Sequence, residues 1–129
     1  MSIQTAIYSR LINNATVGAA VGTKVFPVFA PAETAYPFIV FQIISQSPTL
    51  VKDGVSPLDE VSLQVDIYSH RHQECYNIAV AVRSSLDGWT STADKIKVVF
   101  DNESDAPPDL GLEVFAKSQD YNIRQNRTS

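Results

Sequence analysis

The segment Val28–Pro48, VFAPAETAYPFIVFQIISQSP, decides the fold because it holds one of the most apolar runs in the chain. Between Phe38 and Ile44 the only polar side chain belongs to Gln42. Successive side chains of a strand point to opposite faces of a sheet, so a strand with one face in water alternates apolar and polar residues. This run is apolar on both faces, one formed by Phe38, Val40 and Ile44 and the other by Ile39, Phe41 and Ile43. We predict a strand over about 38–46 whose second face needs a cover of its own.

The next apolar segment, near residues 60–69, alternates and therefore predicts a strand with one buried face. Its expected inward side chains are Val61, Leu63, Val65 and Ile67, and its expected outward side chains are Ser62, Gln64, Asp66 and Tyr68. Between the two strands, Asp53-Gly54 is a turn signal flanked by apolar residues. The sequence thus predicts a long hairpin whose protruding tip carries Leu50, Val51, Lys52, Asp53 and Val55.

Two helical patterns frame these strands. Ser2 can cap a first helix over about 2–14, and a loop-like stretch with breakers at Gly18 and Gly22 follows it. A second helix within 72–88 should bury one face, formed by Ile78, Val82 and Leu86. Further strands are expected near 25–29, 95–101 and 112–124, with a flexible tail from about residue 125.

The order α-β-β-β-α-β-β indicates an α+β fold, with a single antiparallel sheet of about five strands and two helices mainly on one face. A chain of 129 residues fits one domain, spanning 1–129. Its net charge of −4 offers no basic footprint for nucleic acid. The single Cys75 excludes an internal disulfide and favours a reducing compartment. We expect neither a signal peptide nor a membrane span.

The segment HRHQEC supplies metal-ligand types in His70, His72 and Cys75. It lacks the i, i+4 histidine pair of a helical zinc motif, and the chain has no second Cys/His group. The pattern therefore predicts a polar first helical turn, with Cys75 buried as a small hydrophobe and no metal bound.

The acidic segment 101–113 begins like a calcium loop, with Asp101, Glu103 and Asp105 at alternate positions. Leu112 stands where the bidentate glutamate belongs, and Glu113 comes one residue late. We therefore expect a solvated acidic turn between two strands. The carboxylates Asp59, Glu60 and Asp66 are likewise interpreted as exposed strand acids.

No pattern in the sequence indicates an enzyme. The chain has neither a Gly-x-Ser-x-Gly elbow nor a glycine-rich phosphate loop, and Cys75 lies on the apolar face of its helix. We predict no catalytic residue, no cofactor-binding residue and no cofactor.

The chain resembles the tail completion, or tail terminator, proteins of long-tailed bacteriophages with non-contractile tails. Its first block joins a strand ending in Pro27, an Ala30-Pro31 loop, a Tyr36-Pro37 pair and the apolar strand Phe38–Ile44. The second block is a strand ending Val65-Asp66-Ile67-Tyr68-Ser69, followed by a helix ending Val82-Arg83-Ser84-Ser85-Leu86-Asp87. The similarity spans about residues 3–123.

This resemblance implies a structural protein that forms a ring, typically hexameric, on the finished tail tube. The ring would end tube polymerisation and present the surface for joining the head. Its partners would be further copies of itself, the tail tube protein and a head-completion or connector protein, with DNA passing through the lumen without specific binding. We expect it in the virion, at the head–tail junction, after assembly in the host cytoplasm and without contact to a membrane. The second face of the apolar strand would then be covered by a neighbour in the ring.

The resemblance also suggests roles for two surfaces. We expect the hairpin tip (Leu50, Val51, Lys52, Asp53 and Val55) to contact a neighbouring subunit or the tail tube. We expect the outward row Ser62, Gln64 and Asp66 to face the lumen. Two alternatives remain open: another head–tail connector or stopper protein, and a small cytosolic ligand-binding α+β module. A metal-dependent enzyme built on His70 and His72 is disfavoured by the ligand spacing.

Overall fold

A computed structural model describes residues 3–51, 54–91, 95–109 and 114–126. The described part contains three helices and six strands. In chain order these are α1 (Ile3–Ile12), α2 (Ala15–Val21), β1 (Val25–Pro27), β2 (Phe38–Val51), β3 (Gly54–Ser69), α3 (His72–Leu86), β4 (Thr90–Ser91), β5 (Ile96–Asp109) and β6 (Val114–Asn126).

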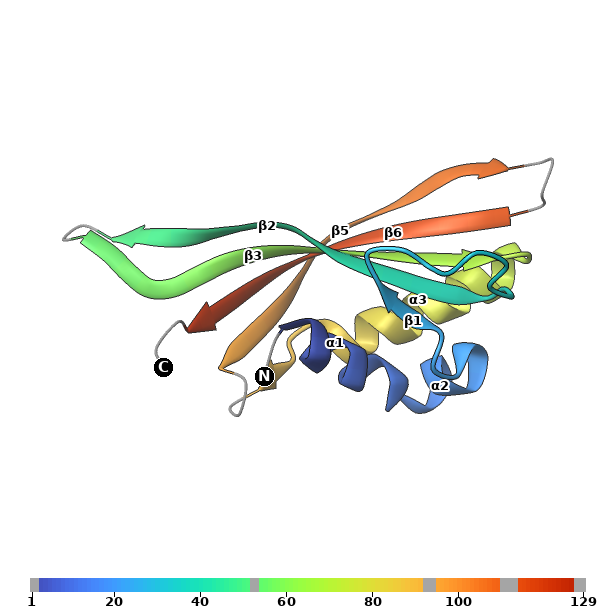
Figure 1. The fold of residues 1–129 in the computed structure, drawn as a ribbon, viewed down its shortest axis with the longest axis horizontal. Coiled ribbons are helices and arrows are strands. Elements are labelled where there is room, and N and C mark those ends of the chain that lie inside the picture. The colour runs from blue at the N-terminus through green and yellow to red at the C-terminus, as the bar shows by residue number, and fades with distance from the viewer. Residues whose placement is uncertain (1–2, 52–53, 92–94, 110–113, 127–129) are drawn as a thin grey trace.

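All six strands form one strongly twisted sheet in the order β1-β2-β3-β6-β5-β4, with the three helices on one face (Figure 1). The mixed fold and the placement of the helices on one face are as predicted. The prediction of a wholly antiparallel sheet is wrong at one edge, because β1 pairs in parallel with β2, with Val25 opposite Ile39. The 28–37 segment returns the chain to the end at which β1 begins, so both strands run the same way. The two-residue β4 is too short to leave a periodic pattern in the sequence.

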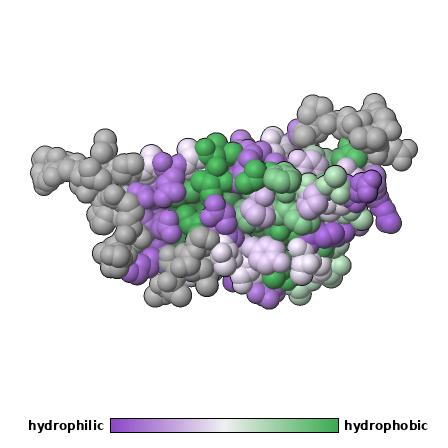
Figure 2. Space-filling model, viewed as in Figure 1, coloured by the Kyte–Doolittle hydropathy of each residue, from purple (hydrophilic) through white to green (hydrophobic). Residues whose placement is uncertain are grey.

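The helices cover a continuous apolar core. The predicted inward side chains Val61, Leu63, Val65, Ile67, Ile78, Val82 and Leu86 are each at most 2% exposed. The predicted register of β3 is therefore confirmed, since a slip by one residue would have buried the polar row instead. In the view of Figure 2, hydrophobic surface gathers over the upper middle of the molecule, with hydrophilic surface on either side of it and along the lower edge.

The prediction of a loop after the first helix is wrong, because residues 15–21 form helix α2. Asn14 starts this helix: its side-chain Oδ1 accepts hydrogen bonds from the backbone N–H groups of Thr16 and Val17, each at 3.0 Å. Such a cap satisfies donors that the first turn leaves open. Val17 is buried in the core, so packing outweighs the low helix propensity of Gly18.

The strands run further than predicted. β2 and β3 continue to the tip of their hairpin, where Leu50 pairs with Val55, and β6 continues through Asn126 where a flexible tail was expected. Register shifts in β2 between Ile43 and Ser45 and between Pro48 and Leu50 accommodate the irregular stretch without ending the strand.

The second face of β2 is covered within the chain itself. Phe38 and Val40 are only 9% and 8% exposed. The Phe38 ring lies 5.0 Å from that of Tyr36 and 5.1 Å from that of Tyr68, with Phe26 at 6.4 Å, centroid to centroid. The expectation that this face is buried only on assembly is therefore wrong for Phe38 and Val40, and only Ile44, at the register shift, is left about half exposed.

Candidate assembly surfaces

The helix-free face of the sheet carries the polar row predicted for β3. Ladder partners share a face, so Asp66 lies beside Ser118, Gln64 beside Asp120, and Ser62 beside Asn122. Gln64 Nε2 donates to Asp66 Oδ1 at 3.0 Å. Ser62, Gln64 and Asp66 are all partly exposed, which confirms their outward orientation. Tyr68 belongs to the same row, and burial against Phe38, with Asp66 nearby, raises the pKa of its hydroxyl.

Charge is distributed unevenly over this face. Carboxylates of Asp66 and Asp120 occupy its centre, whereas Glu60, Arg124 and Lys97 meet at one end, opposite one another in the ladder. Arg124 Nε and Glu60 Oε1 are 4.0 Å apart and both side chains are exposed. An exposed pair of this kind adds little stability. The basic groups of this face therefore lie at its end, apart from the acidic centre.

The β2–β3 hairpin extends well beyond the helices (Figure 1). Leu50, Val51 and Val55 lie on its strands, with Val51 opposite Gly54. Lys52 and Asp53 fall outside the described residues, as do the side-chain contacts of the whole tip. The hairpin itself is as predicted, and its tip contacts stay a prediction.

Residues 101–109 of the acidic segment belong to strand β5 and do not form the predicted solvated turn. Asp105 Oδ1 accepts a hydrogen bond from Lys117 Nζ at 2.6 Å, and Gln119 Nε2 donates to Glu103 Oε1 at 2.7 Å. Lys117 and Gln119 are buried beneath α3. The bond from Lys117, helped by its charge, lowers the pKa of Asp105, and the same bond raises the pKa of Lys117. These carboxylates are thus engaged by β6 and do not converge on a cation site.

A buried hydrogen-bonded chain continues from this pair. Gln119 Nε2 also donates to the Ala79 carbonyl of α3 at 2.9 Å, and its Oε1 accepts from the Tyr121 hydroxyl at 2.7 Å. Burial raises the pKa of Tyr121 strongly. Asp59 is a further correction: it is buried, not exposed, and accepts a hydrogen bond from Gln46 Nε2 at 3.0 Å.

The structure separates the three metal-ligand types. The His70 ring lies 4.4 Å from that of Tyr36, whereas the His72 ring lies 5.8 Å from that of Phe115. Cys75 is buried and its Sγ lies 3.5 Å from the Ile67 carbonyl oxygen, and burial raises the pKa of its thiol to about 11. Within the described ranges no group of three His, Cys, Asp or Glu residues is arranged to hold a metal ion.

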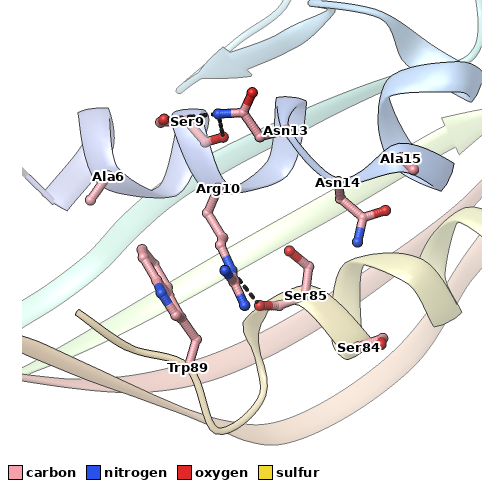
Figure 3. A pocket seen from close by; sticks show the side chains of 9 residues that line it. All are labelled: Ala6, Ser9, Arg10, Asn13, Asn14, Ala15, Ser84, Ser85 and Trp89. Atoms are coloured by element: carbon pink, nitrogen blue, oxygen red, sulfur yellow. Dashed lines mark hydrogen bonds between the residues drawn. The ribbon is translucent and has the colours of Figure 1, made fainter.

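A surface pocket of about 590 Å³ lies between α1 and the end of α3 (Figure 3). Arg10 spans it: its Nε donates to the Ser85 carbonyl at 2.9 Å, and its guanidinium lies 5.1 Å from the centre of the Trp89 ring. The described lining residues include no carboxylate and no histidine, so the pocket lacks a base for acid–base or nucleophilic chemistry. Its contacts tie the first helix to the third.

The outermost strands β1 and β4 are short, so they leave long unpaired edges on the strands next to them, β2 and β5. β1 covers β2 only as far as Phe41, and β4 with the turn before it covers β5 only as far as Phe100. Beyond these points neither strand has an outer strand neighbour among the described residues. Unpaired edges are ready to pair with another chain. Sequence reasoning missed them, because a pattern of alternation shows which face of a strand is buried but not which strand ends the sheet.

Among the helices of the described part, none is long and apolar enough to cross a membrane.

Comparison with known proteins places the chain among phage tail components. The family model described as tail completion protein gp17 matches residues 5–106. No curated protein matches the chain. Among solved structures, a chain of the "Virion of native gene transfer agent (GTA) particle" shares the fold with a TM-score of 0.78 at 17% sequence identity, over 95% of this chain and 93% of that chain.

Proposed function

The chain belongs to the tail completion protein gp17 family and is a phage tail structural protein, as the sequence resemblance predicted; from this premise we propose that it forms a ring that caps the tail tube. The ring ends tube polymerisation and offers the surface to which the head is joined. It acts at the head–tail junction, after assembly in the host cytoplasm.

The observation that carries this proposal is the pair of unpaired sheet edges on opposite sides of one subunit. Beyond Phe41, β2 is open on one side, and beyond Phe100, β5 is open on the other. A ring requires a head-to-tail contact between two different patches of the same chain. Two open edges at opposite ends of one sheet meet this requirement, because the β2 edge of one copy can pair with the β5 edge of the next.

In such a ring, we assign the helix-free face to the lumen. Ser62, Gln64 and Asp66 then line the channel, and the central carboxylates of Asp66 and Asp120 face the passing DNA. Negative charge repels phosphate, so the wall does not retain DNA. DNA therefore passes without specific binding.

The hairpin is the part of each subunit that reaches furthest from the helices. We assign its tip, Leu50, Val51, Lys52, Asp53 and Val55, to a contact with the neighbouring subunit or the tail tube protein. Replacing residues 47–58 by a two-residue Asn-Gly turn should keep the fold, because the helices pack on the other part of the sheet. Normal oligomers and normal tail capping by that variant would remove the tip from the interface.

Tail length tests the function directly. Tails assembled with the protein should have one length and join heads, and tails assembled without it should form overlong tubes, as seen by electron microscopy. Tails of uniform length in its absence, combined with a failure to join heads, would replace this proposal by a connector or stopper role.

A further inference from the structure

Two basic side chains lie directly opposite each other at one end of the helix-free face. Lys97 of β5 and Arg124 of β6 are partners in the antiparallel ladder. Both point away from the core, because their chain neighbours Val98 and Ile123 are fully buried. Like charges in directly opposed positions of a sheet repel each other and lower its stability. The isolated subunit therefore gains nothing from this pair, whereas an anion held between the two groups would stabilise it.

The subunit itself neutralises only part of this charge. The Glu60 carboxylate of β3 lies 4.0 Å from Arg124 Nε, longer than a hydrogen bond, and both side chains are more than half exposed. Within the described ranges, the exposed Lys97 side chain makes neither an ion pair nor a hydrogen bond. Two bases and one acid leave this end of the face with a net positive charge.

A surface pocket of about 330 Å³ surrounds the two basic groups, and we call it the basic pocket. It is lined by Glu60, Lys97, Val99, Asn122, Ile123 and Arg124. Asn122 lies opposite Val99 in the ladder and is exposed, so its side-chain amide can donate a further hydrogen bond. A guanidinium, an ammonium and an amide that line one pocket are donors suited to the oxygens of a phosphate group.

The basic pocket is the positive region of a face that is otherwise neutral or acidic. In the described strands, Lys97 and Arg124 are the basic residues on the helix-free face, whereas Lys117 lies on the helix side. The carboxylates of Asp66 and Asp120 occupy the centre of the helix-free face. An anion that approaches this face is therefore repelled from its centre and attracted to one end.

We infer that the basic pocket binds a phosphate group of the backbone of duplex DNA. The inference rests on the proposed ring, in which the helix-free face lines the channel, and it assigns to each subunit one point of contact with the DNA. A phosphate fits because its oxygens accept hydrogen bonds from Lys97 and Arg124 together, and its charge removes their repulsion. A contact to the backbone carries no sequence information, so the DNA still passes without specific binding.

DNA fits this place better than a carboxylate of a neighbouring protein chain. At Lys97 the edge of β5 is already covered, because Thr90 of β4 pairs with it. The edge pairing that builds the proposed ring begins only beyond Phe100, so it does not bring a neighbouring strand to the pocket. What reaches the pocket in the ring is the content of the channel, and DNA is its anion.

The centre and the end of the face then act differently on the DNA. Repeated around the ring, Asp66 and Asp120 keep phosphates away from the wall, whereas Lys97 and Arg124 hold them loosely. The holding end lies towards the β2–β3 hairpin, because Glu60 precedes Asp66 on the strand that leaves the hairpin tip. The contact weakens as salt rises, because each bound phosphate releases counterions.

Photocross-linking in DNA-filled phage particles tests the occupant of the pocket. The photoreactive residue p-benzoylphenylalanine replaces Val99, which lines the pocket and is 46% exposed. Irradiation should attach DNA to this position. The matched probe replaces Val80, which is 51% exposed on helix α3, and should attach none. A cross-link from position 99 to protein alone would overturn DNA as the occupant.

Charge variants in the same particles test the basic pair. Lys97→Gln combined with Arg124→Gln should lower the yield of the DNA cross-link about tenfold, because phosphate contacts supply sequence-independent affinity. The control combines Lys24→Gln with Arg71→Gln, which removes the same charge at two positions outside the strands and should leave the yield unchanged. An equal yield from both double variants would overturn the role of Lys97 and Arg124.

Inorganic phosphate tests the pocket without the ring, in thermal unfolding of the purified full-length protein followed by circular dichroism. Phosphate stabilises many proteins by exclusion from their surface, so the Lys24→Gln, Arg71→Gln control measures that general effect. Relative to sodium chloride of the same ionic strength, phosphate should raise Tm more for wild type and control than for the Lys97→Gln, Arg124→Gln variant. Equal increases for all three would overturn the phosphate site. Phosphate binding without a DNA cross-link would overturn the DNA contact, and the tail-length measurement decides separately whether the ring fails as well.

Discussion

Helix α3 rests on two different surfaces of the same sheet. Towards β3 it packs on apolar side chains, such as Ile67, that are shielded from water. Towards β5 and β6 it meets a chain of polar groups, in which Gln119 bridges Glu103, Tyr121 and the Ala79 carbonyl. Apolar packing tolerates small adjustments of geometry, whereas a buried hydrogen-bonded chain is stable only when every member is satisfied. The apolar side therefore supplies most of the stability, and the polar side fixes how the β5–β6 hairpin sits under the helix.

The largest effect should come from breaking the apolar side. Ile67→Ala removes buried methyl and methylene groups and leaves a cavity, which should lower the free energy of unfolding by about 2–5 kcal/mol. Urea unfolding followed by circular dichroism measures it. A loss of stability smaller than that caused by removing the hydrogen bonds of Gln119 would show that the apolar side does not supply most of the stability.

Cutting the polar chain should cost less. Gln119→Leu keeps a similar volume but leaves the buried Tyr121 hydroxyl without its acceptor, for a loss of about 1–3 kcal/mol. The double variant with Tyr121→Phe removes the donor as well and should recover part of that loss. A double variant less stable than Gln119→Leu alone would show that the hydroxyl has another role.

The contribution of the polar side to the free energy of unfolding should also depend on pH, whereas the contribution of the apolar side should not. The folded-state pKa of Asp105 lies below its ordinary value of 3.8, so its bond with Lys117 stabilises the fold above pH 3.8 and is lost as the pH falls through the lowered pKa. The pKa of Lys117 lies above its ordinary 10.5, so its contribution is complete below pH 10.5 and is lost as the pH rises through the raised value.

The variant Lys117→Met isolates this contribution. Thermal unfolding should show a gap between wild type and variant that stays constant at neutral pH and narrows below pH 3.8 and above pH 10.5. For Ile67→Ala the gap to wild type should not follow these steps. A gap for Lys117→Met that is unchanged at pH 3 would dismiss the ion pair as its source.

The smallest effect on stability should come from the helix-free face of the sheet, on which helix α3 does not pack. Asp66→Lys should change the free energy of unfolding by no more than about 0.5 kcal/mol. In the proposed lumen it adds positive charge from every subunit, so DNA ejection should slow while tail assembly stays normal. Undiminished ejection from particles with normal tails would place Asp66 outside the channel.

Sequence alone predicted the apolar side well and the polar side poorly. Alternation at Val61, Leu63, Val65 and Ile67 reports burial directly, because a core face needs apolar side chains at every second position. Glu103 and Asp105 also alternate, but polar alternation resembles a solvated segment until its partner strand is known. The signal was present in Lys117 and Gln119, which stand at the same spacing and pair with them across the hairpin. Only the register of β5 and β6 shows that this spacing becomes a contact, and alternation within each strand does not give that register.

The assembly surfaces show the same limit. The polar row of β3 was predicted because its orientation follows from its own strand. The exposed turn at Val28 and Phe29 was missed because it depends on the φ of 72° at Val28, a backbone conformation that a β-branched residue disfavours. Sequence reasoning also missed the parallel pairing of β1 with β2 and the burial of Phe38 and Val40 within the chain. Both depend on the path of the 28–37 segment, which leads back to the end of the sheet at which β1 begins.

The burial of Phe38 and Val40 by residues of the same chain affects when this surface becomes protected from water. Exposed apolar strands bring chains together indiscriminately while they wait for their proper partner. Here Tyr36, Phe26 and Tyr68 surround Phe38 within each newly made subunit. The face of β2 that carries Phe38 and Val40 is thus covered from the moment of folding, whereas the edge of β2 beyond Phe41 stays open. Under the proposed function, covering this face requires neither a neighbouring subunit nor a tail tube.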